Sequence, residues 1–166
     1  MAASYGAVLQ AISHISLPAK GIADASIRNI ILLHPLLSFK ESWRLGLNRL
    51  RAHSARRYGW ETYALDARNH GESPWTETHD YAGMVADLKL FMDSLSPRDS
   101  STEVRQNVLV GHSQGGKLAM LYALLFPEQV HRLFVIDAAP AAYTHSHDSL
   151  FPVSYTHLTL PTNREV

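Results

Sequence analysis

Residues 111–117 (GHSQGGK) fit two unrelated chemistries. As G-x-S-x-G they place a nucleophilic serine, Ser113, on a tight turn between a strand and a helix. As G-x-x-x-x-G-K they match a phosphate-binding loop, which also needs a hydroxyl after its lysine to hold magnesium. Here Leu118 follows Lys117, so the sequence favours the nucleophile over the nucleotide site.

The segments on either side of the motif fit the nucleophile. A strand predicted over Asn107–Gly111 leads into the motif, and an apolar helix predicted over Lys117–Phe126 leaves it. We expect Ser113 to have a strained backbone, with glycine at Gly111 and Gly115 to avoid clashes.

The helix after the motif would direct its positive end at the site where an oxyanion develops. We therefore predict that the backbone N–H of Gln114 is one donor of an oxyanion hole.

Strands and helices alternate along the rest of the chain. Further buried strands are predicted over Asn29–His34, Thr62–Asp66 and Arg132–Asp137, with one or two outer strands within Val8–Leu17. Helices are predicted over Glu41–Arg57 and over Tyr81–Leu95, the second capped by Asp80. This alternation predicts an α/β fold: a mostly parallel sheet with helices on both faces. Its site would lie at the carboxyl ends of the strands, where His34–Ser38, Asp66–Ser73 and Gly111–Gly116 fall.

The charge balance and composition of the chain disfavour several classes of function. The 166 residues suffice for one domain, and 15 basic residues balance 15 acidic ones, which disfavours a nucleic-acid partner. The arginines in the helix predicted over Glu41–Arg57 are read as a solvated face. The chain has no cysteine and no apolar run long enough to span a membrane. The first 20 residues do not resemble a secretory signal, so we expect a cytoplasmic location, or a mitochondrial one in a eukaryote.

Several blocks in order resemble the α/β-hydrolase superfamily: IILLHPLLSFKESW, LDARNHGESPW, VLVGHSQGGKLAMLYALLFPEQV and LFVIDAAPAAY. More narrowly, DARNHGESP, GHSQGGK and IDAAPAAY resemble YbfF-type esterases and their eukaryotic relatives of the abhydrolase domain-containing 11 type. The resemblance covers about residues 30–151 and implies a serine hydrolase acting on small carboxylic esters or thioesters, without a metal or cofactor.

The resemblance also assigns roles to individual residues. Ser113 is the nucleophile, Asp137 is the acid, and the N–H of Leu36 is the second oxyanion donor. The family usually has glycine where this chain has Pro35, which fixes φ and removes an N–H.

The loop that holds Asp66, Arg68 and His70 is expected to be structural. Asp66 and Arg68 would pair with each other, and Gly71 would allow the turn.

The resemblance places the base of the triad, a histidine, well after the acid. The histidines that follow Ser113 are His131, His145, His147 and His157. None of them matches the family position. Residues 153–162 (VSYTHLTLPT) instead resemble a translation of adapter DNA from sequencing libraries. We therefore predict an incomplete α/β-hydrolase domain over residues 1–151 and a non-native tail over residues 152–166.

An incomplete domain has two expected consequences. The 166-residue chain would be inactive for lack of a base, and the strand Arg132–Asp137 would leave an apolar edge exposed. The alternative function is a non-catalytic binding protein on the same fold, which keeps the pocket and has lost the chemistry.

Overall fold

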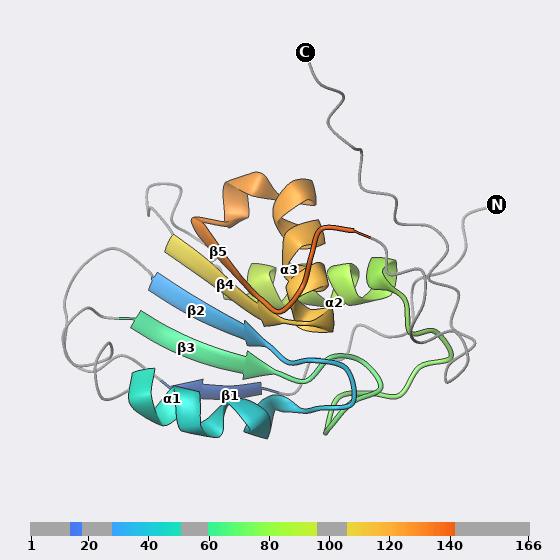
Figure 1. The fold of residues 1–166 in the computed structure, drawn as a ribbon, viewed down its shortest axis with the longest axis horizontal. Coiled ribbons are helices and arrows are strands. Elements are labelled where there is room, and N and C mark those ends of the chain that lie inside the picture. The colour runs from blue at the N-terminus through green and yellow to red at the C-terminus, as the bar shows by residue number, and fades with distance from the viewer. Residues whose placement is uncertain (1–13, 18–27, 51–59, 96–105, 142–166) are drawn as a thin grey trace, which may run out of the picture.

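A computed structural model describes residues 14–17, 28–50, 60–95 and 106–141, which form one five-stranded sheet (Figure 1). In chain order its strands are β1 (His14–Leu17), β2 (Arg28–Leu33), β3 (Trp60–Leu65), β4 (Gln106–His112) and β5 (Arg132–Ile136). They lie side by side in the order β1-β3-β2-β4-β5. Only the β1–β3 pair is antiparallel, so the predicted mostly parallel sheet is confirmed.

Helices cover both faces of this sheet, because its central strands are apolar on both sides. In β2, Ile31 and Leu33 pack on the face covered by α2 (Tyr81–Ser94) and α3 (Gln114–Leu125). Ile30 and Leu32, which alternate with them along β2, face a smaller cluster. That cluster includes side chains from the 3-10 helix η1 (Lys40–Trp43) and from α1 (Arg44–Leu50).

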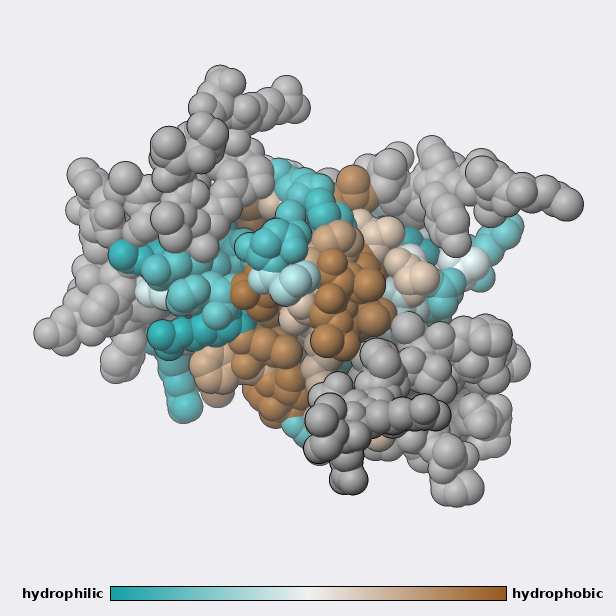
Figure 2. Space-filling model, turned by 90° about the horizontal axis from the view of Figure 1, so that it is seen from above, coloured by the Kyte–Doolittle hydropathy of each residue, from teal (hydrophilic) through white to brown (hydrophobic). Residues whose placement is uncertain are grey.

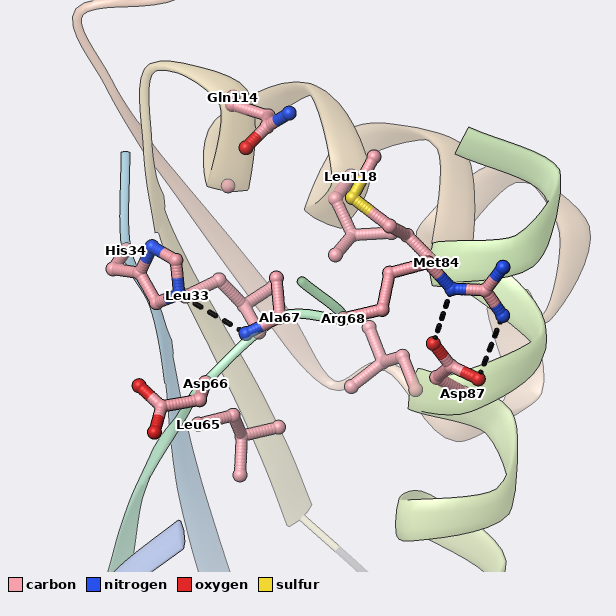
Figure 3. Close-up of a pocket in the computed structure, with 12 residues that line it drawn as sticks. Leu33, His34, Leu65, Asp66, Ala67, Arg68, Met84, Asp87, Gln114 and Leu118 are labelled. Atoms are coloured by element: carbon pink, nitrogen blue, oxygen red, sulfur yellow. Dashed lines mark hydrogen bonds and ion pairs between the residues drawn. The ribbon is translucent and has the colours of Figure 1, made fainter. Parts of the chain in front are cut away.

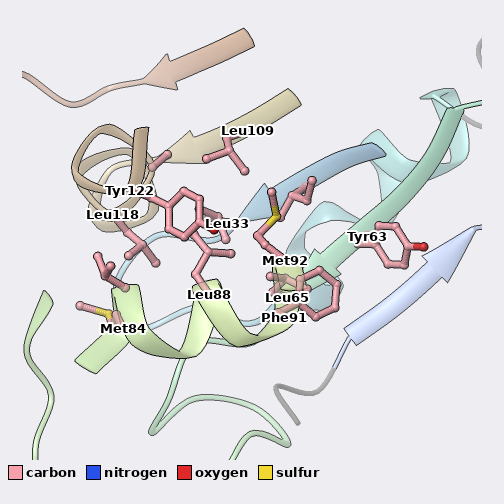
Figure 4. Packing of buried hydrophobic residues seen from close by; sticks show 13 residues of the cluster. Leu33, Tyr63, Leu65, Met84, Leu88, Phe91, Met92, Leu109, Leu118 and Tyr122 are labelled. Atoms are coloured by element: carbon pink, nitrogen blue, oxygen red, sulfur yellow. The ribbon is translucent and has the colours of Figure 1, made fainter. Parts of the chain in front are cut away.

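The larger cluster forms the main core (Figure 4). Met84, Leu88, Phe91 and Met92 from α2 lie against the sheet, beside Tyr122 from α3. Their spacing of three and four residues places them on one side of α2, as the sequence pattern predicted. The predicted cap is also confirmed, because the Gly83 N–H donates to Asp80 Oδ1 at 2.7 Å.

Two predicted helices differ from those in the structure. The segment predicted as a helix from Glu41 begins as the 3-10 helix η1 and continues as α1, and residues 51–57 lie outside the described residues. The helix after the motif starts at Gln114, three residues before the predicted start, and the short 3-10 helix η3 (Pro127–Gln129) follows it. The apolar sequence of this helix indicates burial, which holds for Leu118, Ala119 and Tyr122 but not for Leu124 and Leu125 in its exposed last turn.

Strand β5 lies at one edge of the sheet and exposes apolar side chains, as predicted. Figure 2 views the molecule from the top of Figure 1 and shows hydrophobic residues gathered at the centre of that face. The exposed large apolar residues of β5 are Leu133, Phe134 and Ile136.

Candidate active site

Ser113 forms the turn between β4 and α3, with φ 51° and ψ −113°. A side chain at positive φ is strained, and neighbouring structure must hold it there. Two backbone hydrogen bonds do so: the Ser113 N–H donates to Ile136 O at 2.9 Å, and the Lys117 N–H donates to Ser113 O at 3.1 Å. The predicted strained turn is therefore confirmed.

The two glycines beside Ser113 are required by close backbone contacts. A Cβ on Gly111 would lie 2.2 Å from Gly115 O, and a Cβ on Gly115 would lie 2.4 Å from Leu33 O. Helix α3 therefore begins directly against the ends of β2 and β4, and only glycine permits that approach.

Backbone strain also recurs in the other loops at the carboxyl ends of the parallel strands. Among the described residues, the non-glycine residues with positive φ are Leu37 after β2, Asn69 after β3, Ser113 after β4 and Asp137 after β5. Strained residues of this kind gather where a fold fixes functional groups. The carboxyl edge of the sheet is thus the candidate site.

The loop that was predicted to supply an oxyanion donor starts beside the serine turn. Leu33 lies opposite Gly111 in the β2–β4 register, and His34 follows it. The ring of His34 fixes this start, because its Nδ1–H donates to Pro35 O at 2.8 Å and its Nε2 accepts from the Ala67 N–H at 3.0 Å (Figure 3). Pro35 lacks an N–H, but its carbonyl accepts the hydrogen bond from His34. The role of the Leu36 N–H as an oxyanion donor stays a prediction.

Asp137 lies one strand away from Ser113, directly after β5. Its side chain is 88% exposed, and its Oδ2 is 3.9 Å from Nε2 of His112. The structure therefore places the predicted acid beside the serine turn. Within the described residues, no hydrogen bond joins the Ser113 hydroxyl to an imidazole.

The loop after β3 is held by ion pairs, but the predicted pairing of Asp66 with Arg68 is wrong. Arg68 instead donates to both carboxylate oxygens of Asp87 on α2, at 2.7 and 2.9 Å (Figure 3). Asp66 pairs with Lys40: the Nζ of Lys40 lies 2.8 Å from Oδ2 of Asp66. Asp66 contacts η1 and Arg68 contacts α2, which cover opposite faces of the sheet. Residues two apart in an extended strand would share one face, but the chain turns at Arg68 and the two side chains separate. The predicted turn at Gly71 is confirmed by its φ of 53°.

Three imidazoles form a row along the site, which sequence reasoning missed. The ring centroids of His34 and His70 are 5.1 Å apart, as are those of His70 and His79. At the end of the row, the Gln114 side-chain amide donates to His79 Nε2 at 2.9 Å. The only sequence signal was that these histidines fall in loops that end at the same sheet edge.

Burial lowers the pKa of both His34 and His79 below the ordinary 6.5. In the unfolded chain these two histidines bind protons at a higher pH than they do in the folded chain. The folded state therefore loses stability as pH falls below about 6.5. We expect the urea midpoint of unfolding to drop between pH 7 and pH 5, and to drop less in a His79→Gln variant. Equal slopes for both proteins would contradict this prediction.

A small apolar pocket lies between the sheet, α2 and α3 (Figure 3). Leu33, Leu65, Met84 and Leu118 line it, and Gln114 borders it next to the serine turn. Within the described part of the chain, no group of three His, Cys, Asp or Glu side chains could hold a metal ion.

The comparisons with known proteins agree with this geometry. Residues 30–164 match the alpha/beta hydrolase family. The chain belongs to that family. Its sheet order and its strained serine turn are thus those of an alpha/beta hydrolase fold.

Two of the relatives of this chain are named for chemistry on acyl groups. The chain is 36% identical over 139 residues to the sn-1-specific diacylglycerol lipase ABHD11 of Mus musculus, covering 83% of this chain and 42% of that protein. It is 34% identical over 116 residues to a probable alcohol acetyltransferase of Saccharomyces cerevisiae, covering 68% of this chain and 31% of that protein.

A solved structure of a marine microorganism esterase superposes with a TM-score of 0.66 at 28% identity. The match covers 81% of this chain and 44% of the esterase. The chain thus spans less than half the length of these relatives. Of the helices among the described residues, none is both long and apolar enough to cross a membrane.

Proposed function

We propose that Ser113 is the nucleophile of a serine hydrolase that acts on a small carboxylic ester or thioester. The observation that carries this proposal is the strained backbone of Ser113, at φ 51° between β4 and α3. This conformation has a steric cost and exposes a hydroxyl at the start of a helix. The names of the two relatives describe chemistry on acyl groups, which supports the substrate class.

The reaction would proceed by acyl transfer through the serine. The Ser113 oxygen attacks the acyl carbon, its proton passes to a base, and the alcohol or thiol leaves with a proton. Water then releases the acid from the acylated serine. The N–H groups of Gln114 and Leu36 would stabilise the negative oxygen of each tetrahedral intermediate, assisted by the amino end of α3.

The base decides whether the 166-residue chain turns over substrate. We propose Asp137 as the acid, because it lies beside the serine turn at the end of the neighbouring strand. Among the described residues, no imidazole is hydrogen-bonded to the Ser113 hydroxyl, and His145, His147 and His157 lie outside them. Without a base, kcat is expected to fall by about 10⁶-fold.

A non-catalytic binding protein is the second candidate. Two observations favour it: the Ser113 hydroxyl has no imidazole partner within the described residues, and proline stands at position 35. Such a protein would keep the fold and the apolar pocket, but its serine would remain unreactive.

A fluorophosphonate probe tests the proposed function. We expect it to label Ser113 in the 166-residue chain when imidazole is added as an external base, and we expect no label in a Ser113→Ala variant. Peptide mass spectrometry locates the label.

The same experiment without added imidazole reports on the base. Labelling of Ser113 in its absence would show that the chain supplies its own base, and alanine variants of His145, His147 and His157 would then identify it. If Ser113 remains unlabelled in both conditions, the nucleophile proposal is wrong and the binding protein is favoured.

A further inference from the structure

Lys40, the first residue of η1, is a lysine with only 3% of its surface exposed. Its Nζ donates to Asp66 Oδ2 at 2.8 Å and to Glu72 Oε2 at 2.6 Å. Its backbone N–H donates to the other carboxylate oxygen, Asp66 Oδ1, at 2.7 Å. One carboxylate therefore holds both the main chain and the side chain of Lys40.

The carboxylate that holds Lys40 is itself fixed. Asp66 is fully buried, and the Glu72 N–H donates to its Oδ2 at 3.0 Å. The Ser73 hydroxyl donates to the Asp66 carbonyl at 2.7 Å. A Cβ on Gly71 would lie 2.2 Å from Asp66 Oδ2, so the turn closes tightly over the carboxylate. Asp66 thus offers Lys40 a single, rigid position.

Lys40 and His34 hold the two ends of one loop. His34 is tied to the main chain of Ala67, and Lys40 is tied to the side chain of Asp66. The two residues to which they are tied, Asp66 and Ala67, are adjacent and directly follow β3. The segment between the anchors contains Leu36, the proposed oxyanion donor, and Leu37 with its φ of 58°.

Electrostatics keep this anchor charged. Burial alone would lower the pKa of Lys40, but hydrogen bonds to Asp66 and Glu72 outweigh it, so the pKa is raised. Burial alone would raise the pKa of Asp66, but the bond from Lys40 and two backbone N–H groups lower it instead. Both groups therefore stay ionised around neutral pH, and neither tolerates loss of its partner.

We infer that Lys40 is a positioning residue that fixes the loop carrying the Leu36 N–H in the geometry needed for oxyanion binding. This inference rests on the proposed function. A lysine that only stabilised the fold would affect unfolding without a specific effect on this loop or on the reactivity of Ser113.

The test compares Lys40→Met with the conservative Lys40→Arg and with Lys89→Met. Lys89 also donates to a carboxylate, that of Asp93, but on an exposed stretch of α2 away from the loop. Two quantities are measured under native conditions: amide hydrogen exchange of the peptide that spans residues 34–40, and the rate of Ser113 labelling by the fluorophosphonate with imidazole present.

For Lys40→Met we expect exchange in residues 34–40 to rise by about tenfold or more while exchange in α3 is unchanged. The labelling rate is expected to fall roughly 10- to 100-fold, because a misplaced donor no longer reaches the oxyanion. In Lys40→Arg, both the exchange rate of residues 34–40 and the labelling rate of Ser113 should return most of the way to the parent values. Lys89→Met should match the parent chain in both.

Unchanged exchange in Lys40→Met would overturn the inference, as would raised exchange with an unchanged labelling rate. If Lys40→Met does not fold, the variant Lys40→Met/Asp66→Asn removes both buried charges and the same two measurements decide. If the parent chain is never labelled, the proposed function fails, and the inference that Lys40 positions an oxyanion donor fails with it. The exchange data would still show whether Lys40 orders the loop.

Discussion

A Gly115→Ala variant is expected to lose at least about 4 kcal/mol of unfolding free energy and all labelling at Ser113. The added Cβ would lie 2.4 Å from Leu33 O, 2.6 Å from Leu33 C and 2.7 Å from His34 O. These are backbone atoms at the end of β2, which the β2–β4 and β2–β3 ladders hold on both sides. The methyl can be accommodated only if α3 withdraws from the sheet, and that movement would displace the Gln114 N–H.

Gly116→Ala is the matched control, one residue further along the same helix. Its Cβ would lie 3.1 Å from Ala138 Cβ, Gly111 O and Val135 Cγ1, so small adjustments suffice. Alanine also gains about 1 kcal/mol of helix propensity over glycine, which offsets the crowding. We expect its unfolding free energy to stay within about 1 kcal/mol of the parent.

Urea unfolding followed by circular dichroism measures both glycine variants. Equal stability losses in Gly115→Ala and Gly116→Ala would contradict the close approach of α3 to the end of β2. Ser113 labelling retained in a folded Gly115→Ala protein would show that the turn does not depend on that approach.

The sequence predicted the sheet well, because its strongest signal is local. Apolar residues on both sides of β2 required cover on both faces, and the helices flank them in the order that a parallel sheet imposes. The conformation of Ser113 was equally predictable, because G-x-S-x-G between a strand and a helix requires that turn.

Long-range charge pairing could not be predicted from the sequence. Asp66 and Arg68 are close along the chain, but their partners, Lys40 and Asp87, are 26 and 19 residues away. Nearness in sequence suggested a pair, whereas the turn that begins at Arg68 directs its side chain to α2 and away from Asp66. Lys40 gave no sequence signal, because a lone lysine after a strand is usually solvated.

Part of the candidate site was hidden for a related reason. Positive φ at Leu37 and Asp137 follows from how the loops meet at the sheet edge, and neither residue type favours that conformation as glycine does. The imidazole row likewise depends on two loops, one after β2 and one after β3, that converge only after folding.

An Arg68→Met variant is expected to lose about 3–5 kcal/mol of unfolding free energy. The guanidinium holds Asp87 through two hydrogen bonds, and both side chains are about 10% exposed. Its removal leaves the Asp87 carboxylate buried in α2 without its charged partner. Arg68 also packs on Gly83 at the start of α2, where a Cβ would lie 2.1 Å from Nη1. Methionine keeps the apolar stem, so the variant removes the ion pair and the 3.2 Å hydrogen bond from Nη1 to Thr78 Oγ1 and little of the packing.

Lys89→Met on the same helix separates a buried pair from an exposed one. The side chains of Lys89 and Asp93 are 29% and 47% exposed, and the pair is a surface i, i+4 contact worth about 0.5 kcal/mol or less. The double variant Arg68→Met/Asp87→Leu removes both buried charges and should recover part of the loss, because no unpaired carboxylate remains. A similar small loss for Arg68→Met and Lys89→Met in urea unfolding would mean that the Arg68–Asp87 pair does not hold α2 to the loop after β3. In that case the Lys40–Asp66 pair would be the more important ion pair for this loop, and Lys40→Met would be the more damaging substitution.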